Sequence, residues 1–452
     1  MHLLWENVVK NLMLLWTGDY KQLDEGSEEY QIESKVWEAI GESSAASGST
    51  IPYAFGPRPP NVASDKTSWT ADSRSFWTLY LGPSLLQGRF KQRKYYDHFV
   101  KLVKLLNLCL QFEITKHEVE EVRAGFIEWV KEYERIYYQY DPQRLSACPL
   151  TIHALLHIAD SIIAAGPVWA SWAYPMERYC GLLQPAIRSR RFAYASIDRY
   201  VVDHARLQHI KLLYNMQQEL SLKAPPKSSV GTKVPGYEEY ALLPPSSCHQ
   251  AVKMNAMDKA VFDRVVGALC TRFNSTPTQV KEVLGATKWQ EWGKVQILGG
   301  GDLIRTVKCD KKAEDSRDAS CIRYELLVDR NARYRNRQTI LEKQTFFGRL
   351  QHIFHLQLPY EPATMRPRGS SITNGPIHII LAVIRSLPVT EKHPSLDVHY
   401  FTSEGALEAV DLSTVSCLVG CFKVDKTSHK WALIDRSGQL ARAVYVGDEG
   451  DM

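Results

Sequence analysis

The sequence predicts an α+β multidomain protein, in which an α-helical N-terminal unit precedes a small, β-rich, barrel-like C-terminal domain. Three observations support this. The chain has 452 residues, more than one ordinary core accommodates. Apolar residues recur at helical spacing as far as about residue 220, whereas beyond Trp292 they form short segments with strand-like alternation. Between these regions lies a Pro- and Ser-rich stretch, residues 221–250, which reads as a linker.

The N-terminal helices follow from periodicity and from their end signals. Thr115 and Glu118 have the spacing of a capping box, and Gly166-Pro167 ends a helix. The region 1–220 is therefore expected to hold helices at 1–17, 28–41, 68–85, 91–112, 115–140, 151–165, 175–183 and 196–219. A long loop rich in Gly, Ser and Pro is expected after the second of them.

The second half begins with a short helical segment, 251–290, broken near Ser275–Pro277. Residues 291–452 then form the expected β-rich domain. Its candidate strands are "KVQILGG", "LIRTVKC", "IRYELLVD", "TFFGRLQHIFHLQL", "IHIILAVIRSLPV", "SCLVGCFKV", "WALIDRSG" and "RAVYVG". Short strands at this spacing favour a small barrel or sandwich.

Composition restricts the cellular setting. The net charge of +5 permits nucleic-acid binding without arguing for it. The nine cysteines include no CxxC motif, which indicates a reducing compartment, with Cys417 and Cys421 interpreted as core thiols. No window approaches the roughly 20 apolar residues of a membrane span. The predicted location is the nucleus or cytoplasm rather than outside the cell, with neither a membrane nor a small-molecule substrate as partner.

The segment "TIHALLHIADSIIAAGPVWASWAYPMERY" (151–179) carries polar groups in an apolar run. His153 and His157 share one helix face and are candidate ligands of a metal ion such as Zn²⁺. No Glu adjoins either histidine in the manner of zinc proteases. The alternative is a pair of core histidines bonded to the backbone or to a carboxylate. Glu177, flanked by Pro175-Met176 and Tyr179, needs either an arginine partner or a divalent metal.

A basic cluster follows Glu177 in the sequence. Arg188, Arg190 and Arg191 precede Phe192 and Tyr194. Such clusters bind phosphate backbones without reading the base sequence, although a solvated face has the same composition. The segment "RNARYRNRQ" (330–338), with Arg330, Arg333, Arg335 and Arg337, is a second basic cluster.

Longer stretches resemble a known family. "MHLLWENVVKNL", "CPLTIHALLHIADSIIAAGPVWASWAYPMERYCGLLQPAIRSRR" and "DRYVVDHARLQHIK" resemble the later half of CACTA (En/Spm)-type DDE transposases, closest to the fungal forms. The C-terminal strands resemble the small domain that follows in the same proteins. The resemblance implies an RNase H-like core in which Asp, Asp and Glu bind two divalent ions, Mg²⁺ or Mn²⁺, to cut and join DNA.

The resemblance also assigns roles. Met1-His2 looks like the end of a D-x-x-H motif, Glu177 like the final catalytic acid, and the residues between them like the helical insertion, so that the N-terminal unit holds the insertion and the final helices of the core. His2, His153 and His157 become candidate metal ligands beside Glu177. Arg188, Arg190, Arg191, Arg199 and Arg206 become candidate contacts to the backbone of double-stranded DNA at transposon ends.

Both family aspartates lack a counterpart in these 452 residues, so Glu177 is expected to be vestigial. The sequence is therefore interpreted as a truncated, inactive transposase-like protein whose partner would be the missing N-terminal portion. The alternative is a non-catalytic interaction protein that binds DNA or chromatin and carries a β-barrel module. Asp435 is interpreted as the cap of a turn before Gly438, and His352 and His355 as surface or packing histidines.

Overall fold

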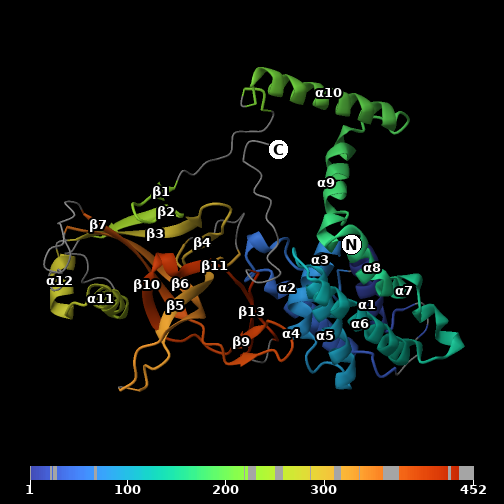
Figure 1. Ribbon diagram of the computed structural model, residues 1–452, viewed down its shortest axis with the longest axis horizontal. Helices are drawn as coiled ribbons and strands as arrows, with labels where there is room; N and C mark the ends of the chain where they lie inside the picture. The colour runs from blue at the N-terminus through green and yellow to red at the C-terminus, as the bar shows by residue number, and fades with distance from the viewer. Residues whose placement is uncertain are drawn as a thin grey trace. The chain divides into compact units, whose positions relative to one another are not determined.

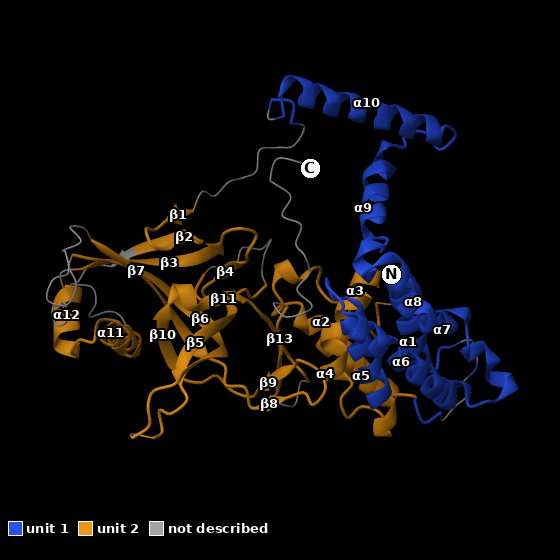
Figure 2. Cartoon of the chain, viewed as in Figure 1, with its two compact units in different colours: residues 1–30, 97–229, 442–452 blue, residues 31–96, 230–441 orange. Residues whose placement is uncertain are grey.

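The computed structural model describes residues 2–20, 23, 28–65, 69–217, 219–221, 231–249, 258–285, 287–309, 317–334, 336–359, 376–425 and 429–436. The chain divides into two compact units (Figures 1 and 2). Unit 1 comprises residues 1–30, 97–229 and 442–452, and unit 2 comprises residues 31–96 and 230–441. The described part of unit 1 is helical, and unit 2 combines sheet with helices. The expected mixture of helical and β-rich parts is therefore confirmed.

Unit 1 contains the helices that precede residue 220, except those between residues 31 and 96. The chain enters it through a π-helical segment that continues directly into the first α-helix, and α5 begins in unit 2. The elements are His2–Val9 (π), α1 (Lys10–Thr17), α5 (Arg93–Cys109), α6 (Lys116–Tyr133), Glu134–Tyr138 (π), α7 (Leu150–Ala154), α8 (Ile158–Ala165), α9 (Tyr174–Leu183) and α10 (Ala193–Tyr214).

The expected end signals of these helices are confirmed. The Thr115 side chain accepts a hydrogen bond from the Glu118 backbone N–H, and the Glu118 carboxylate accepts one from the Thr115 backbone. This capping box satisfies backbone donors that the first turn of α6 leaves without helical partners. Gly166 adopts a φ of 84° and ends α8, a conformation that glycine reaches without a Cβ clash.

The core of unit 1 is an aromatic cluster formed by α1, α5 and α6. Trp16, Trp129, Tyr133 and Tyr137 are almost completely buried. The Trp16 indole N–H donates to the Tyr137 hydroxyl at 3.0 Å, and the Tyr133 hydroxyl donates to the Ala147 carbonyl at 2.8 Å. Because these polar tips are hydrogen-bonded, the rings contribute apolar burial without leaving those groups unsatisfied.

Unit 2 is built around a curled antiparallel sheet (Figure 1). Its main path runs β1-β2-β3-β6-β5-β11, with β4 paired to β3, β7 to β6, and β10 to β7. The strands are β1 (Thr232–Lys233), β2 (Tyr240–His249), β3 (Lys288–Ile297), β4 (Leu303–Arg305), β5 (Cys321–Asp329), β6 (Leu341–Leu358), β7 (Ile377–Ser386), β10 (Leu407–Asp411) and β11 (Val415–Leu418).

Two apolar clusters and a second sheet complete the β-rich part of unit 2. One cluster fills the concave interior with residues such as Ile322, Leu350 and Ile384. The other lies between the sheet and the helices, where Val265 and Leu269 share one cluster with strand residues. These helices are α11 (Lys259–Phe273) and α12 (Pro277–Gly285), separated at the expected Ser275–Pro277 break. A four-stranded sheet holds β8 (Glu391–Lys392), β9 (His399–Phe401), β12 (Gly420–Lys423) and β13 (Trp431–Ile434).

The early helices of unit 2 belong with the strands rather than with the helices that flank them in sequence (Figure 2). Ser84 hydrogen-bonds Tyr400 at 3.2 Å, and Tyr96 hydrogen-bonds His393 at 2.8 Å. The Asp318 backbone N–H donates to the Ser49 carbonyl. The elements are α2 (Ser34–Ser47), α3 (Ala71–Phe76), Trp77–Leu81 (π) and α4 (Gly82–Leu85). Periodicity alone does not reveal such long-range grouping.

The structure differs from the expected linker at 221–250, because β1 and β2 lie within it. Pro244 and Pro245 are tolerated in β2 because its pairing with β3 shifts register between Leu243 and Ser246. The expected strand "SCLVGCFKV" is also divided at Val419 into β11 and β12, which belong to different sheets. The expected strand "RAVYVG" lies outside the described residues.

Within the described ranges, no single helix is long and apolar enough to cross a membrane. The helices Leu150–Ala165 and Val168–Ala186, bent by 75°, pass this test only as a pair.

Candidate functional site

His2 and Glu177, the two ends of the predicted site, lie together in unit 1. The His2 Nε2 is 3.3 Å from Glu177 Oε1, and the His2 Nδ1 is 2.5 Å from Glu6 Oε2. Glu177 stands in the first turn of α9, and 44% of its side chain is exposed. His2 occupies the first turn of the chain's opening helix, with Met1 outside the described residues. One histidine therefore lies between two carboxylates on the surface.

His153 and His157 do not lie in the core, so the alternative of two buried histidines is wrong. They occupy the exposed side of a segment whose other side buries Ile152, Leu155 and Ala159. Their Nε2 atoms are 3.2 Å apart. Helical spacing thus places both imidazoles on one face, as the sequence predicts.

The described residues do not provide a complete metal site. They contain no group of three or more His, Cys, Asp or Glu side chains arranged to hold a metal ion. A two-metal centre requires carboxylates that bridge and flank both ions, and structural zinc requires four ligands. The described residues therefore do not bring together the ligand set that either kind of site needs.

The five candidate DNA-binding arginines follow Glu177 on α10 and on the segment between α9 and α10. Arg188, Arg190, Arg191, Arg199 and Arg206 are all exposed. Arg191 lies over the Phe192 ring, 5.4 Å from its centroid, and Arg206 is 3.6 Å from Asp203. Residues 184–214 contain six Lys or Arg but only two Asp. The result is a positively charged surface on α10 and the segment before it, in which no described residue is buried.

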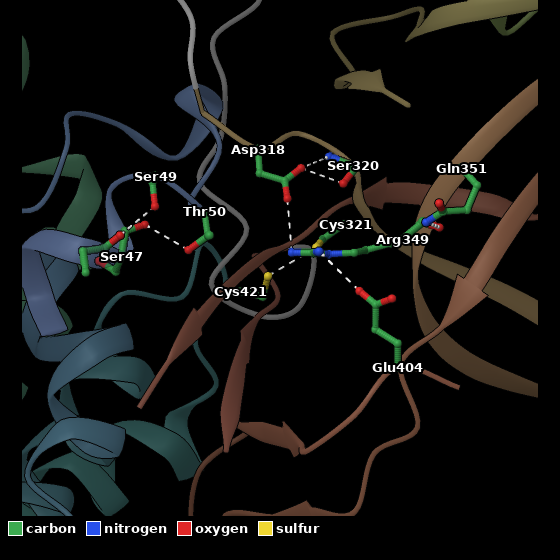
Figure 3. Close-up of polar contacts among 11 residues, drawn as sticks. Ser47, Ser49, Thr50, Asp318, Ser320, Cys321, Arg349, Gln351, Glu404 and Cys421 are labelled. Atoms are coloured by element: carbon green, nitrogen blue, oxygen red, sulfur yellow. Dashed lines mark hydrogen bonds and ion pairs between the residues drawn. The ribbon is translucent and has the colours of Figure 1, made fainter. Parts of the chain in front are cut away.

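Unit 2 contains a polar cluster that no sequence pattern predicts, and Figure 3 shows it. The Cys421 Sγ lies 3.3 Å from the Cys321 Sγ, and both thiols are buried. Arg349 Nη2 is 3.3 Å from Asp318 Oδ2, and its Nη1 is 3.3 Å from Glu404 Oε1. The interpretation of Cys421 as a core thiol is confirmed, but Cys417 is only half-buried. No sequence signal joins Cys321 to Cys421 across 100 residues.

The electrostatics of this cluster make the two thiols unequal. The hydrogen bond with Cys321 lowers the pKa of Cys421, and the Arg349 guanidinium acts in the same direction against the effect of burial. The same hydrogen bond, together with burial, raises the pKa of Cys321. The two buried thiols therefore differ in acidity, and either sulfur can donate the hydrogen bond between them.

We expect Arg349→Leu to lower the free energy of unfolding of unit 2 by about 2–4 kcal/mol. Removing the guanidinium leaves the Asp318 carboxylate, already engaged by Ser320, without its cation in a half-buried position. Urea denaturation followed by circular dichroism measures the loss. Arg264→Leu, at an exposed position of α11, is the control, with an expected change within about 0.5 kcal/mol. Equal stability of the two variants would contradict a structural role for Arg349.

Other predicted roles have specific outcomes. Asp435 forms an ion pair with Arg323 at 3.1 Å, which is its structural role, while Gly438 of the expected turn lies outside the described residues. His352 is buried and sits 2.6 Å from Glu291, and His355 contacts His378 at 3.0 Å. Both are packing histidines, as expected.

Comparison with known proteins gives no match for this chain among family models, curated proteins or solved structures.

Proposed function

We propose that residues 1–220 derive from the later part of a CACTA-type DDE transposase, with Glu177 as the vestigial third acid of an RNase H-like core. We further propose that the chain binds double-stranded DNA without cleaving it. Such a protein would act in the nucleus.

The observation that supports the origin is the proximity of His2 and Glu177. The resemblance assigns them to two motifs of one site, separated in sequence by the whole helical insertion. Their side chains are 3.3 Å apart. An unrelated helical protein has no reason to bring these two positions together, whereas a DDE core requires its second and third motifs to meet.

The proposal assigns no cleavage activity to this chain. Two-metal chemistry with Mg²⁺ or Mn²⁺ depends on several carboxylates. The two family aspartates have no counterpart in these 452 residues. Glu177 and Glu6 are both beside His2, but these two carboxylates are fewer than a centre with two divalent ions needs.

DNA binding is supported by the exposed arginines after Glu177. Arg188, Arg190 and Arg199 form no ion pair with any described residue, so no described carboxylate neutralises their charge. Arginine forks match phosphate oxygens, and each phosphate contact releases counterions. The expected interaction is therefore strong at low salt and insensitive to sequence.

We expect the triple variant R188A/R190A/R191A to bind duplex DNA more weakly and with less salt dependence. Fluorescence anisotropy of a labelled duplex, measured between about 50 and 200 mM salt, gives the slope of log affinity against log salt. Losing three contacts should reduce the magnitude of that slope by about 3, at roughly 0.9 per phosphate.

The matched control is K116A/K131A/R135A, which removes three exposed positive charges from α6 and the turn after it. It should bind like the wild type. Equal losses in both variants would mean only a dependence on net charge, and no binding at about 50 mM salt would refute a direct DNA role. Glu177→Gln should leave DNA binding unchanged, and cleavage of DNA by the wild type with Mg²⁺ or Mn²⁺ would refute the inactive state.

A further inference from the structure

The hairpin between β5 and β6 extends as an arm from the curled sheet of unit 2 (Figure 1). The pairing of the two strands continues to Asp329↔Leu341. Between Leu327 and Thr345 no described residue is buried, although Tyr324 and Phe347 just below are. This arm, residues 327–345, therefore contributes no described residue to the core. We look for its role at the surface of the molecule.

The charge of the arm is concentrated at its tip. Residues 330–340 contain four arginines and no Lys, Asp or Glu. Arg330, Arg333 and Arg337 are exposed, and Arg335 lies outside the described residues. Lys343 at the base pairs with Glu325. The positive charge that remains available thus belongs to guanidinium groups at the end of the arm.

The tip is held by its own contacts. The Asp329 carboxylate accepts hydrogen bonds from the backbone N–H groups of Asn331 and Ile340, at 2.9 and 3.0 Å. The Asn331 side chain donates to the Gln338 carbonyl at 2.7 Å. The Arg337 guanidinium lies over the Tyr334 ring, 4.3 Å from its centroid. The Asp329 carboxylate therefore closes the loop, and Arg330, Arg333 and Arg337 are exposed on the turn that these contacts hold.

We propose that this arm is a second nucleic-acid contact, which inserts into the major groove of duplex DNA and places its arginines on phosphates and base edges. A two-stranded ribbon fits the major groove, which is about 12 Å wide. The four pairs from Leu326↔Gln344 to Asp329↔Leu341 rise by roughly 10 Å, at about 3.3 Å per residue, and the loop adds to this length. The arm is long enough to reach the floor of the groove.

The distribution of side chains favours DNA over a membrane surface. Leu327, Ile340 and Leu341 are 67%, 53% and 59% exposed and lie in or beside the paired strands, and Tyr334, 55% exposed, lies against Arg337 in the loop. A membrane-inserting hairpin needs its apolar side chains at the tip, where this arm carries arginine. Arginine without lysine also matches the planar, bidentate recognition of phosphate and of guanine.

This inference is independent of a transposase origin, because it uses residues of unit 2 alone. The test compares R330A/R333A/R337A in the full-length chain with K259A/R264A/K281A, which removes three exposed charges from α11 and α12. At about 100 mM salt the arm variant should bind duplex DNA at least about tenfold more weakly, and its salt slope should fall by about 3. The control should match the wild type. R330K/R333K/R337K should recover the slope but not the full affinity.

Insertion of the arm into the major groove can be measured separately from affinity. Guanine N7 faces the major groove, so the wild type should protect it from methylation by dimethyl sulfate, and the arm variant should not. Repeating the comparison in the R188A/R190A/R191A background separates this contact from the proposed contact at residues 188–206. Wild-type affinity and slope in the arm variant would overturn the proposal. So would arm-dependent binding to anionic vesicles with unchanged DNA binding, or arm-dependent affinity without N7 protection.

Discussion

Replacing Trp129 by alanine is expected to lower the free energy of unfolding of unit 1 by about 3–5 kcal/mol. The Trp129 side chain is fully buried in α6. Its ring stacks on His98 at 4.4 Å between centroids and lies 5.4 Å from Tyr133, and its indole N–H donates to the His98 carbonyl at 3.0 Å. The substitution removes this packing, opens a cavity between α5 and α6, and leaves a buried carbonyl without its side-chain donor.

The measurement is chemical denaturation of the full-length chain, with hydrogen exchange of the α5 and α6 amides to assign the loss to unit 1. Trp169→Ala is the control, since 41% of Trp169 is exposed and its indole N–H bonds only the Phe112 carbonyl. We expect the control to lose no more than about 1 kcal/mol. Similar losses for both variants would mean that the aromatic cluster does not stabilise unit 1.

The sequence predicts the local elements well where one face of a helix is buried. The periodic residues Leu12, Leu15 and Trp16 are buried as expected, and so are Val119, Val122 and Phe126 of α6. In α6, charged side chains occupy most positions between these apolar residues. The helical period therefore also predicts which face of the helix is buried. The α9–α10 region has helical sequence but no buried residue, because periodicity reports the tendency to form a helix and not what covers it.

The sequence did not predict which segments, far apart along the chain, pack together. The contacts of Ser84 with Tyr400 and of Tyr96 with His393 draw the early helices into unit 2. The short strands β8, β9 and β10 were not predicted, because two to five residues carry too little pattern. β2 was not predicted either, because it contains two prolines, which lack the N–H that strand pairing uses. Its register shift leaves both prolines out of the pairing with β3.

The candidate site also has some features that the sequence predicts and others that it does not. Helical spacing predicted that His153 and His157 share a face, because this depends only on local geometry. The proximity of His2 to Glu177 was expected from the family resemblance alone, since no local rule connects the two ends of an insertion. Neither a local spacing nor the family resemblance predicted the cluster of Cys321, Cys421 and Arg349. The order and curvature of the strands bring these residues together.

Unit 1 is expected to lose stability as the pH falls from about 6.5 to about 4, through the titration of His98. Burial lowers the pKa of His98 from 6.5 to about 4. Its Nε2 lies 3.2 Å from the Trp129 carbonyl, whereas its Nδ1 is buried with no hydrogen-bond partner in the structure. Protonation would therefore place a charged donor in an apolar cluster with nothing to accept its hydrogen.

The sign of this pH effect follows from which state of the chain binds the His98 proton. Between pH 6.5 and about 4 the unfolded chain carries the His98 proton and the folded chain does not, so acid favours unfolding. The contribution of neutral His98 is complete above pH 6.5 and is lost below about pH 4, a difference of about 3 kcal/mol at 1.36 kcal/mol per pH unit. Carboxylates titrate in the same range, so the wild type alone does not isolate this effect.

His98→Phe isolates it, because the variant keeps a flat ring against Trp129 and removes both nitrogens. Urea denaturation of both chains at several pH values between 7 and about 4 gives their difference in unfolding free energy, from which common carboxylate effects cancel. Acid should shift that difference in favour of His98→Phe by about 3 kcal/mol, whatever its value at pH 7. Parallel pH curves would mean that His98 is protonated in the folded chain, and the aromatic cluster would then have to admit water or an acceptor near Nδ1.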